Sequence, residues 1–385
     1  MVLQPDYHNN SIVNLMSSLV LGLGGPETPY PPLAWLPPET VTRAANVILL
    51  IIDGLGYNYL KRQESVLNRY LQGHLTSVFP TSTAPAITTF LTGVAPQQHG
   101  VTGWFMHLRE LGTIALLLPF RPRWGTVSFA TAGINVAELI GYPSVFDRLD
   151  AQCRFIVQQN LVDSPYSVTA AGGAERIGYH DLAGCFRAIA NSVKRGAGRR
   201  YIYAYWPLLD KLCHQYGVSS QRVQIHLREL ERSLMNLLKA LEGTNTLVIV
   251  TADHGFIDTD PRLTVQLVDH PELAKCLIMP LCGEPRVAYC YVRPDLRQQF
   301  ESYVKQWLHQ YCEVYPSLEL LNRGWFGLAD PDPRLQHRIG DYVLLSKDSY
   351  AIKDALPREK PWTDWGVHGG VSEDELYVPL IVAHC

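Results

Sequence analysis

The sequence predicts an α/β fold, a three-layer α/β/α sandwich with a mostly parallel central sheet and a smaller α+β cap insertion. The first observation is a set of short, largely apolar runs, which are typical of strands buried on both faces. These runs lie at 47–52, 201–206, 246–252 and 377–382. The second observation is that helical patterns separate the runs. Strands that alternate with helices form a parallel sheet with helices on both faces.

Residues 1–45 are expected to pack on the core as an N-terminal helix and a proline-rich connection. Residues 11–22, SIVNLMSSLVLG, predict an amphipathic helix, because the stretch is shorter than the roughly 20 apolar residues of a membrane span. The prolines of 25–42 predict an extended surface connection. The first residues lack the positive charge of a signal peptide, so we expect a cytoplasmic protein without a membrane partner.

The middle of the chain predicts a long helix followed by the cap. Residues 219–243 have apolar side chains at helical spacing, and Gly243 is expected to end the helix. Residues 277–292 then predict two strands around a Gly-Glu-Pro turn, and a helix follows with Pro294 near its start. We interpret 261–340 as the cap insertion, and 46–260 with 341–385 as a metal-binding catalytic core.

The bulk composition excludes some classes of partner. The chain has 385 residues, of which 47% are hydrophobic, enough for a substantial core. The net charge of -3 and the charged fraction of 18% give no basic surface for a nucleic-acid polymer or an anionic membrane, although a small anionic substrate remains compatible. The eight cysteines form no CxxC pair, which predicts reduced, mostly buried thiols.

Acids and histidines gather where the predicted strands end. In open α/β sheets, ligands bind beyond the carboxyl ends of the strands. Taken alone, each of these residues is also explained by a helix cap, an Asx turn, a surface contact or a position in a loop. Together, their carboxylate and imidazole groups suit Zn²⁺ and related divalent ions, and six ligands divide into two sites of three. The candidates are Asp53, Asp210, His214, Asp253, His254 and His368.

Residues 79–93, FPTSTAPAITTFLTG, carry six hydroxyl side chains in an otherwise apolar run. The segment predicts a helix over 85–92, with Pro85 early and Gly93 as its stop. Thr83 therefore lies at a helix N-terminus, where free N–H groups and the helix dipole favour an anion. The later hydroxyls, Thr88, Thr89 and Thr92, are expected to point to the backbone or to solvent.

Five segments together resemble the type I phosphodiesterase / nucleotide pyrophosphatase branch of the alkaline phosphatase superfamily. They are IIDGLG (51–56), FPTSTAP (79–85) with LTGVAPQQHG (91–100), DKLCH (210–214), TADHG (251–255) and HGG (368–370). The resemblance implies a hydrolase with two divalent ions, usually zinc. It places Asp53, Asp253 and His254 around one ion and Asp210, His214 and His368 around the other. It also implies that Thr83, beside the first ion, attacks phosphorus and forms a phosphothreonine.

Two residues depart from the family pattern beside the nucleophile. Ala86 stands where relatives commonly have an asparagine that contacts a phosphoryl oxygen, and Ser82 stands where they often have lysine. One such transition-state contact is worth about 3 kcal/mol. The leading interpretation is a phosphodiesterase or nucleotide pyrophosphatase acting on a small substrate. The alternatives are a phosphomonoesterase, a phosphonate hydrolase or a non-catalytic metal-binding protein.

Two further features have competing interpretations. Four aromatic residues near the motifs are candidates for stacking on a base, although ordinary packing explains any one of them equally well. They are Trp104, Tyr205, Trp206 and Trp365. The glycines of 22–25 resemble a dinucleotide-binding loop, but no buried strand leads into them, which argues against a dehydrogenase.

Overall fold

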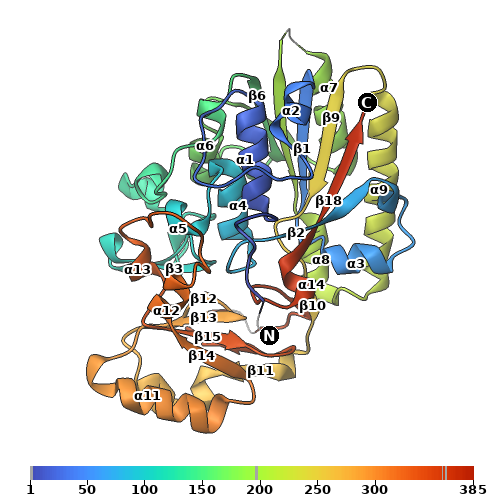
Figure 1. Ribbon diagram of the computed structural model, residues 1–385. Coiled ribbons are helices and arrows are strands. Elements are labelled where there is room, and N and C mark those ends of the chain that lie inside the picture. The colour runs from blue at the N-terminus through green and yellow to red at the C-terminus, as the bar shows by residue number, and fades with distance from the viewer. Residues whose placement is uncertain (1–2, 196–197, 358, 360–361) are drawn as a thin grey trace.

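The computed structural model describes residues 3–195, 198–357, 359 and 362–385. Its centre is a seven-stranded mixed sheet (Figure 1). Its strands in spatial order are β2 (Leu71–Thr76), β18 (Tyr377–His384), β9 (Thr246–Thr251), β1 (Asn46–Ile52), β8 (Arg200–Trp206), β6 (Gln152–Gln158) and β7 (Glu175–Tyr179).

The apolar runs of the sequence form the middle of this sheet. All seven residues of β1 are buried, and β1 pairs in parallel with β8 and β9. β6 and β7 extend the parallel part, whereas β18 is antiparallel to both β9 and β2. The strand β18 runs in the opposite direction because the segment before it, residues 366–376, lies at the carboxyl ends of β1 and β9. The strand therefore starts at that end of the sheet. The predicted α/β fold with a mostly parallel sheet is confirmed.

Helices cover both faces of the central sheet. In Figure 1, α9 lies on one side of it, and α1 and α4 lie on the other. The α-helices are α1 (Ile12–Gly22), α2 (Pro38–Thr42), α3 (Tyr57–Arg62), α4 (Thr83–Thr92), α5 (Pro96–His99), α6 (Pro165–Ala171), α7 (Leu182–Lys194), α8 (Leu208–Tyr216), α9 (Gln221–Ala240), α10 (Pro271–Lys275), α11 (Arg297–Tyr303), α12 (Ser317–Asn322), α13 (Leu335–Arg338) and α14 (Glu373–Leu376).

The helix predicted for 11–22 is present as α1 and packs on the core, but it is buried on almost every side and not on one face alone. Its serines do not face water, because the following segment covers them. Ser17 donates a hydrogen bond to the carbonyl of Tyr30, and Ser18 accepts one from the backbone N–H of Leu33. Gly24 adopts a left-handed conformation with φ of 77° just after the helix. The glycines of 22–25 therefore close a helix and follow no strand.

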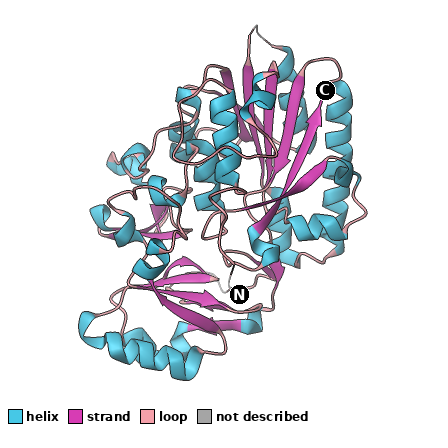
Figure 2. Cartoon of the chain, viewed as in Figure 1, coloured by secondary structure: helices cyan, strands magenta, loops and turns pink. Residues whose placement is uncertain are grey.

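A second, antiparallel sheet lies beside the first; both appear in magenta in Figure 2. Its strands in spatial order are β14 (Cys312–Pro316), β15 (Tyr342–Ser346), β13 (Val287–Cys290), β12 (Cys282–Glu284), β3 (Phe105–Leu108), β4 (Thr113–Leu116) and β5 (Arg121–Pro122). The predicted strand pair around the Gly-Glu-Pro turn is present as β12 and β13. Two small sheets, β10 (Ile257–Asp258) with β17 (Gly366–Val367) and β11 (Thr264–Gln266) with β16 (Ala351–Lys353), complete the strands.

This second sheet extends beyond the expected insertion at 261–340. The strands β3, β4, β5 and β15 all lie outside that range. They are only two to five residues long, too short for an alternating pattern to be recognised in the sequence. The strands β3, β4 and β5 join the sheet through the long-range pairing of Phe105 with Gly283, whereas β15 joins it by pairing with β13 and β14.

Two further expectations concern cysteines and membranes. All eight cysteines are unpaired thiols and most are buried, as predicted. Among the described residues, no helix combines the length and the apolar character that crossing a bilayer requires.

Candidate active site

Two neighbouring strands of the central sheet bring Asp53 and Asp253 together. Asp53 directly follows β1, and Asp253 follows β9 after one intervening residue. His254 Nε2 lies 3.4 Å from Asp53 Oδ1 and 3.4 Å from Asp253 Oδ2. All three side chains are buried. They form a closed group of two carboxylates and one imidazole at the carboxyl end of the sheet.

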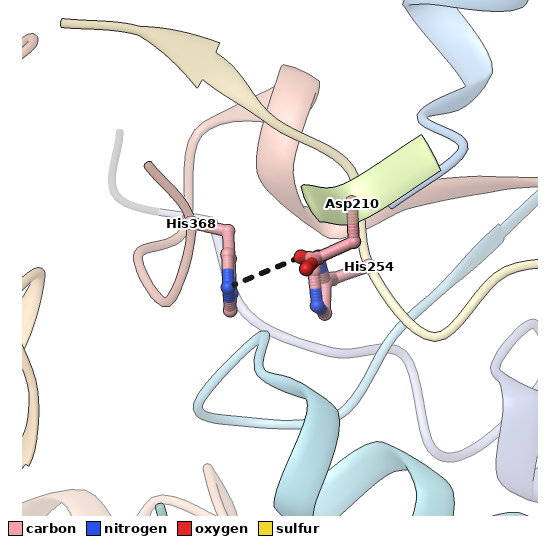
Figure 3. A group of neighbouring side chains, drawn as sticks. All are labelled: Asp210, His254 and His368. Atoms are coloured by element: carbon pink, nitrogen blue, oxygen red, sulfur yellow. Dashed lines mark ion pairs between the residues drawn. The ribbon is translucent and has the colours of Figure 1, made fainter. Parts of the chain in front are cut away.

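A second group adjoins the first. The helix α8 places Asp210 and His214 one turn apart, with His214 Nε2 3.4 Å from Asp210 Oδ1. His368 comes from the loop before α14, and its Nε2 lies 3.8 Å from the same oxygen (Figure 3). The rings of His254 and His368 are stacked, with centroids 3.7 Å apart and planes at 9°. The stacked rings of His254 and His368 therefore place the two groups directly side by side.

The tightest clusters divide differently from the expected two sets of three. Ligand atoms within 4.8 Å of one another belong to Asp53, Asp253 and His254, and to Asp210, His254 and His368. His214 lies at the edge of the second cluster, with Nδ1 3.4 Å from Asp364 Oδ2. The structure thus brings all six predicted residues together and places His254 between the two groups.

The three histidines are held in a common orientation. In each, Nδ1 faces a backbone carbonyl at 3.0–3.1 Å, which leaves Nε2 for the site. The partners are Gly366 for His214, Gly255 for His254 and Thr81 for His368. Contacts of this kind fix the ring and its tautomer for ligands of metal ions.

The charges of the site fit a bound cation. One oxygen of each of the three carboxylates is buried without a hydrogen-bond partner among the described residues: Asp53 Oδ1, Asp210 Oδ1 and Asp253 Oδ2. Burial, together with the carboxylates of Asp253 and Asp210, raises the pKa of Asp53. Burial also raises the pKa of Asp210. Crowded carboxylates of this kind are compensated by a divalent ion, and the mixed oxygen and nitrogen donors suit zinc or a related metal.

Thr83 is the first residue of α4, and its Oγ1 lies 3.2 Å from His254 Nε2. The helix begins two residues earlier than predicted and ends at Gly93, whose φ is 77°. The side chain of Ser82, at the N-cap, makes no hydrogen bond to the helix backbone and donates to Glu284 instead. The hydroxyl of Thr83 therefore meets both the acid–histidine cluster and the N-terminus of a helix, where backbone N–H groups favour an anion.

The later threonines of the same segment are buried, so none of them faces solvent. Thr88 and Thr92 donate to the carbonyls of Ala84 and Thr88, each at 2.7 Å. Thr89 Oγ1 lies 3.1 Å from His99 Nε2. The expectation of backbone partners is confirmed for Thr88 and Thr92, and their hydroxyls are thereby kept away from the site.

Two polar contacts at the site were not predicted from the sequence. The Tyr205 hydroxyl, near the end of β8, donates to Asp53 Oδ2. Glu284, the last residue of β12, accepts hydrogen bonds from the Ser82 hydroxyl and, at 2.6 Å, from the Trp104 backbone N–H. Burial raises the pKa of Glu284 to about 7. Glu284 ends a strand of three residues, which is too short to show a periodic pattern, so only the long-range pairing of that strand brings it here.

Two cavities adjoin Thr83. The larger has a volume of about 590 Å³, and its aromatic lining comprises Trp104, Phe155, Tyr166, Tyr203 and Tyr205. The smaller has a volume of about 330 Å³ and lies between the central sheet and the second sheet; its lining includes Glu284, Lys353, Trp362 and Asp364. Thr83, Trp104 and Asp210 line both. A group bound at Thr83 can therefore extend in two directions.

The four aromatic candidates thus have different positions. Trp104 and Tyr205 line the larger cavity. Trp206 is a core residue that stacks on Tyr179, and its Nε1 donates to His226. Trp365 is half exposed and lines neither of the two cavities.

A protein-family model described as type I phosphodiesterase / nucleotide pyrophosphatase matches residues 47–370, which is most of the chain. The chain belongs to this family. As a type I phosphodiesterase / nucleotide pyrophosphatase, it is a hydrolase of phosphoester bonds from a metal-dependent family, and the clusters around His254 are its candidate metal-binding groups. The resemblance inferred from the five motifs is confirmed.

Solved structures show the same fold. Murine ectonucleotide pyrophosphatase / phosphodiesterase 5 is 17% identical, with a TM-score of 0.66 and 87% of each chain covered. An inactive variant of that protein, in which a threonine is replaced by alanine, was solved in complex with AMP. Phosphonoacetate hydrolase from Sinorhizobium meliloti 1021, solved with phosphonoformate, is 16% identical, with a TM-score of 0.64, and the match covers 88% of this chain and 90% of that one. A comparison with curated protein sequences found no match.

Proposed function

We propose that this enzyme hydrolyses a small phosphodiester or nucleotide pyrophosphate through a phosphothreonine at Thr83, at a site that holds two divalent ions, preferably Zn²⁺. The observation that carries the proposal is the position of Thr83 Oγ1, 3.2 Å from His254 Nε2 and on the wall of both cavities. No other hydroxyl of residues 79–93 combines these two features, since the remaining ones line neither cavity or, like Ser82, donate to another side chain.

Two sets of residues would hold the ions. Asp53, Asp253 and His254 would hold one, and Asp210, His214 and His368 the other, with His254 close to both sets. Bound ions of this kind act as Lewis acids and favour the deprotonated form of a coordinated hydroxyl. The carboxylate oxygens without hydrogen-bond partners, and the histidine Nε2 atoms that the Nδ1 contacts leave for the site, support this assignment.

The residues of the chain support two successive displacements at phosphorus. Thr83 Oγ1 forms a bond to phosphorus while the bond to the leaving oxygen breaks. Water then attacks the phosphothreonine, which releases the phosphoryl product and restores the threonine. The N-terminus of α4 faces the phosphoryl oxygens and favours their negative charge. Tyr205 holds Asp53 in place through its hydrogen bond.

The shape of the site supports a substrate with two substituents. The larger cavity presents aromatic rings on which a base can stack. The murine relative solved with AMP is consistent with a nucleotide of this size. A second candidate, a phosphomonoesterase or phosphonate hydrolase, is favoured by Ala86, whose buried methyl group cannot donate to a phosphoryl oxygen.

A metal-reconstituted activity panel tests the proposal. Protein stripped with a chelator and reloaded with Zn²⁺ would be assayed on a nitrophenyl nucleotide diester, bis-nitrophenyl phosphate, a nitrophenyl monoester and a phosphonate. We expect activity to depend on the metal and to favour the nucleotide diester. A preference for the monoester by orders of magnitude would favour the second candidate. Metal binding without any turnover would support a non-catalytic protein.

A further inference from the structure

Glu284 is a buried carboxyl group whose two oxygens have different surroundings. Its Oε1 accepts hydrogen bonds from the Ser82 hydroxyl and the backbone N–H of Trp104. Its Oε2 has no hydrogen-bond partner among the described residues, and protein atoms do not enclose it completely. Because the side chain lines the smaller cavity, the carboxyl group is anchored through Oε1 and presents Oε2 to that cavity.

This cavity is where a substrate at Thr83 would meet the carboxyl group. Thr83 and Glu284 line it together, and Ser82, which holds Glu284, directly precedes Thr83 in the chain. Among the described residues, Glu284 belongs to neither cluster of candidate metal ligands. Its free oxygen is therefore available to the substrate.

The N-terminus of α4 offers few hydrogen-bond donors to a phosphoryl group. Pro85 has no N–H, and the N–H of Ala86 donates to the carbonyl of Ser82 at 3.0 Å. Of the first four residues of the helix, only Thr83 and Ala84 therefore have an N–H left for a ligand. Among the described residues, no arginine lines either cavity. A phosphoryl group at Thr83 thus needs a donor from another element.

Burial makes the neutral form of Glu284 accessible near neutral pH. It raises the pKa of Glu284 to about 7, against the opposing effect of the two hydrogen bonds to Oε1. A bound phosphoryl anion would raise this pKa further, whereas bound metal ions would lower it. The other titratable groups that line the smaller cavity are Asp210 and His214 of α8, Lys353 of β16, Asp364 and His368.

We propose that Glu284 is a further catalytic residue, a neutral carboxylic acid whose Oε2–H donates a hydrogen bond to a non-bridging oxygen of the phosphoryl group at Thr83. The inference rests on the proposed function. An ionised Glu284 would repel that oxygen, whereas the neutral acid stabilises its charge as Thr83 attacks. Glu284 would thus supply the contact that the side chain of Ala86 cannot make, and it keeps its proton throughout the reaction.

The substitution Glu284→Gln tests the proton directly, because the amide can accept at Oε1 and donate at the other position at every pH. Metal-loaded enzyme would be assayed on bis-nitrophenyl phosphate. We expect kcat/KM of the variant to lie within about threefold of wild type at pH 6 and to exceed wild type by at least about tenfold at pH 9, because only the wild-type carboxyl group ionises. A constant ratio, or a variant inactive at both pH values, would overturn the proposal. Glu319→Gln, which alters an exposed ion pair, is the matched control and should follow wild type.

A second variant distinguishes the phosphoryl oxygen from the leaving oxygen as the acceptor. Glu284→Met removes the donor and should lower kcat/KM at pH 6 by about 10²-fold, with thermal denaturation confirming that the variant is folded. The nitrophenyl and phenyl esters of thymidine 5′-monophosphate share the same phosphoryl oxygens, so we expect equal losses for both within about twofold. A much larger loss for the phenyl ester, the poorer leaving group, would mean that Glu284 protonates the leaving oxygen and would overturn the proposed contact.

A binding measurement separates this inference from the proposed function. In a Thr83→Ala background with metal ion in excess, calorimetry would give Kd for bis-nitrophenyl phosphate, a diester anion whose charge is constant over this pH range. Adding Glu284→Gln should leave Kd at pH 6 within about threefold and tighten binding at pH 9 by at least about tenfold. Equal effects at both pH values would overturn the role of Glu284 and leave the proposed function intact. Wild type that turns over no diester and no nucleotide would overturn both.

Discussion

Thr83 differs from the other hydroxyl residues of 79–93 in its neighbours, because it alone is close to His254 and lines both cavities. We expect Thr83→Ala to lower kcat by about 10³-fold or more, since the nucleophile is lost. Thr83→Ser should retain part of the activity. Because Thr83 is only partly buried, thermal denaturation should show both variants within about 1 kcal/mol of wild type. Full activity in Thr83→Ala would contradict its assignment as the nucleophile.

Glu284 is a buried carboxyl group whose protonation in the folded state can be tested by experiment. Burial raises its pKa from 4.5 to about 7. Between these values the folded chain keeps a proton that the unfolded chain has released, so the free energy of unfolding falls as pH rises. A shift of this size corresponds to about 3 kcal/mol.

Glu284→Gln tests this dependence on metal-free protein. The amide oxygen can still accept hydrogen bonds from Ser82 and Trp104, but the side chain no longer ionises. Denaturant unfolding at pH 5 and pH 8 should show the stability of the variant, relative to wild type, increasing by about 3 kcal/mol at the higher pH. The same difference at both pH values would mean that Glu284 does not hold its proton in the folded state.

At the scale of elements, a buried ion pair joins the second sheet to the loop that carries His368. Arg286, in the turn after β12, contacts both oxygens of Glu375 in α14 at 3.0 Å, and both side chains are almost fully buried. Glu375 Oε1 also accepts from the backbone N–H of Gly370 at 2.8 Å. The pair therefore fixes the turn that follows Glu284 relative to the loop of 368–370.

Removing the arginine should cost stability and activity together. We expect Arg286→Met to lower the free energy of unfolding by about 3–5 kcal/mol, because it leaves a buried carboxylate without its partner. Arg62→Met is the matched control: its pair with Asp374 is exposed and should contribute about 1 kcal/mol or less. Denaturant unfolding measures the free energy of unfolding of both variants. Equal effects of the two variants would show that the buried pair does not hold the two elements together.

The elements that the sequence predicts are those with strong local patterns. The apolar runs identify β1, β8, β9 and β18, and the acids that follow three of them identify the acid–histidine cluster. Glu284, Lys353 and Trp362 have no such signal. Glu284 and Lys353 each end a strand of three residues, and Trp362 lies in a loop. The two strands reach the site only through pairings with distant segments, such as β16 with β11. The lining of the smaller cavity could therefore not be predicted.

At the scale of the whole molecule, the site is formed where the two large sheets meet. The segment before Thr83 belongs to both parts, because Phe79 packs edge-on against Trp325 and Phe326 at centroid distances of 4.9 and 5.2 Å. The segments at the carboxyl end of the central sheet supply the acids and histidines, and the second sheet supplies Glu284. The same junction encloses the smaller cavity, so we expect substrate selection and the position of the proposed nucleophile, Thr83, to depend on one interface.

We propose that hydrolysis proceeds through a covalent phosphothreonine at Thr83. The most direct measurement is the stereochemical course at phosphorus, with metal-loaded enzyme hydrolysing a nucleoside phosphorothioate diester of one configuration in ¹⁸O-labelled water. Each in-line displacement inverts phosphorus, so two successive displacements predict net retention. Net inversion would mean that water attacks the substrate directly, and it would contradict the role given to Thr83.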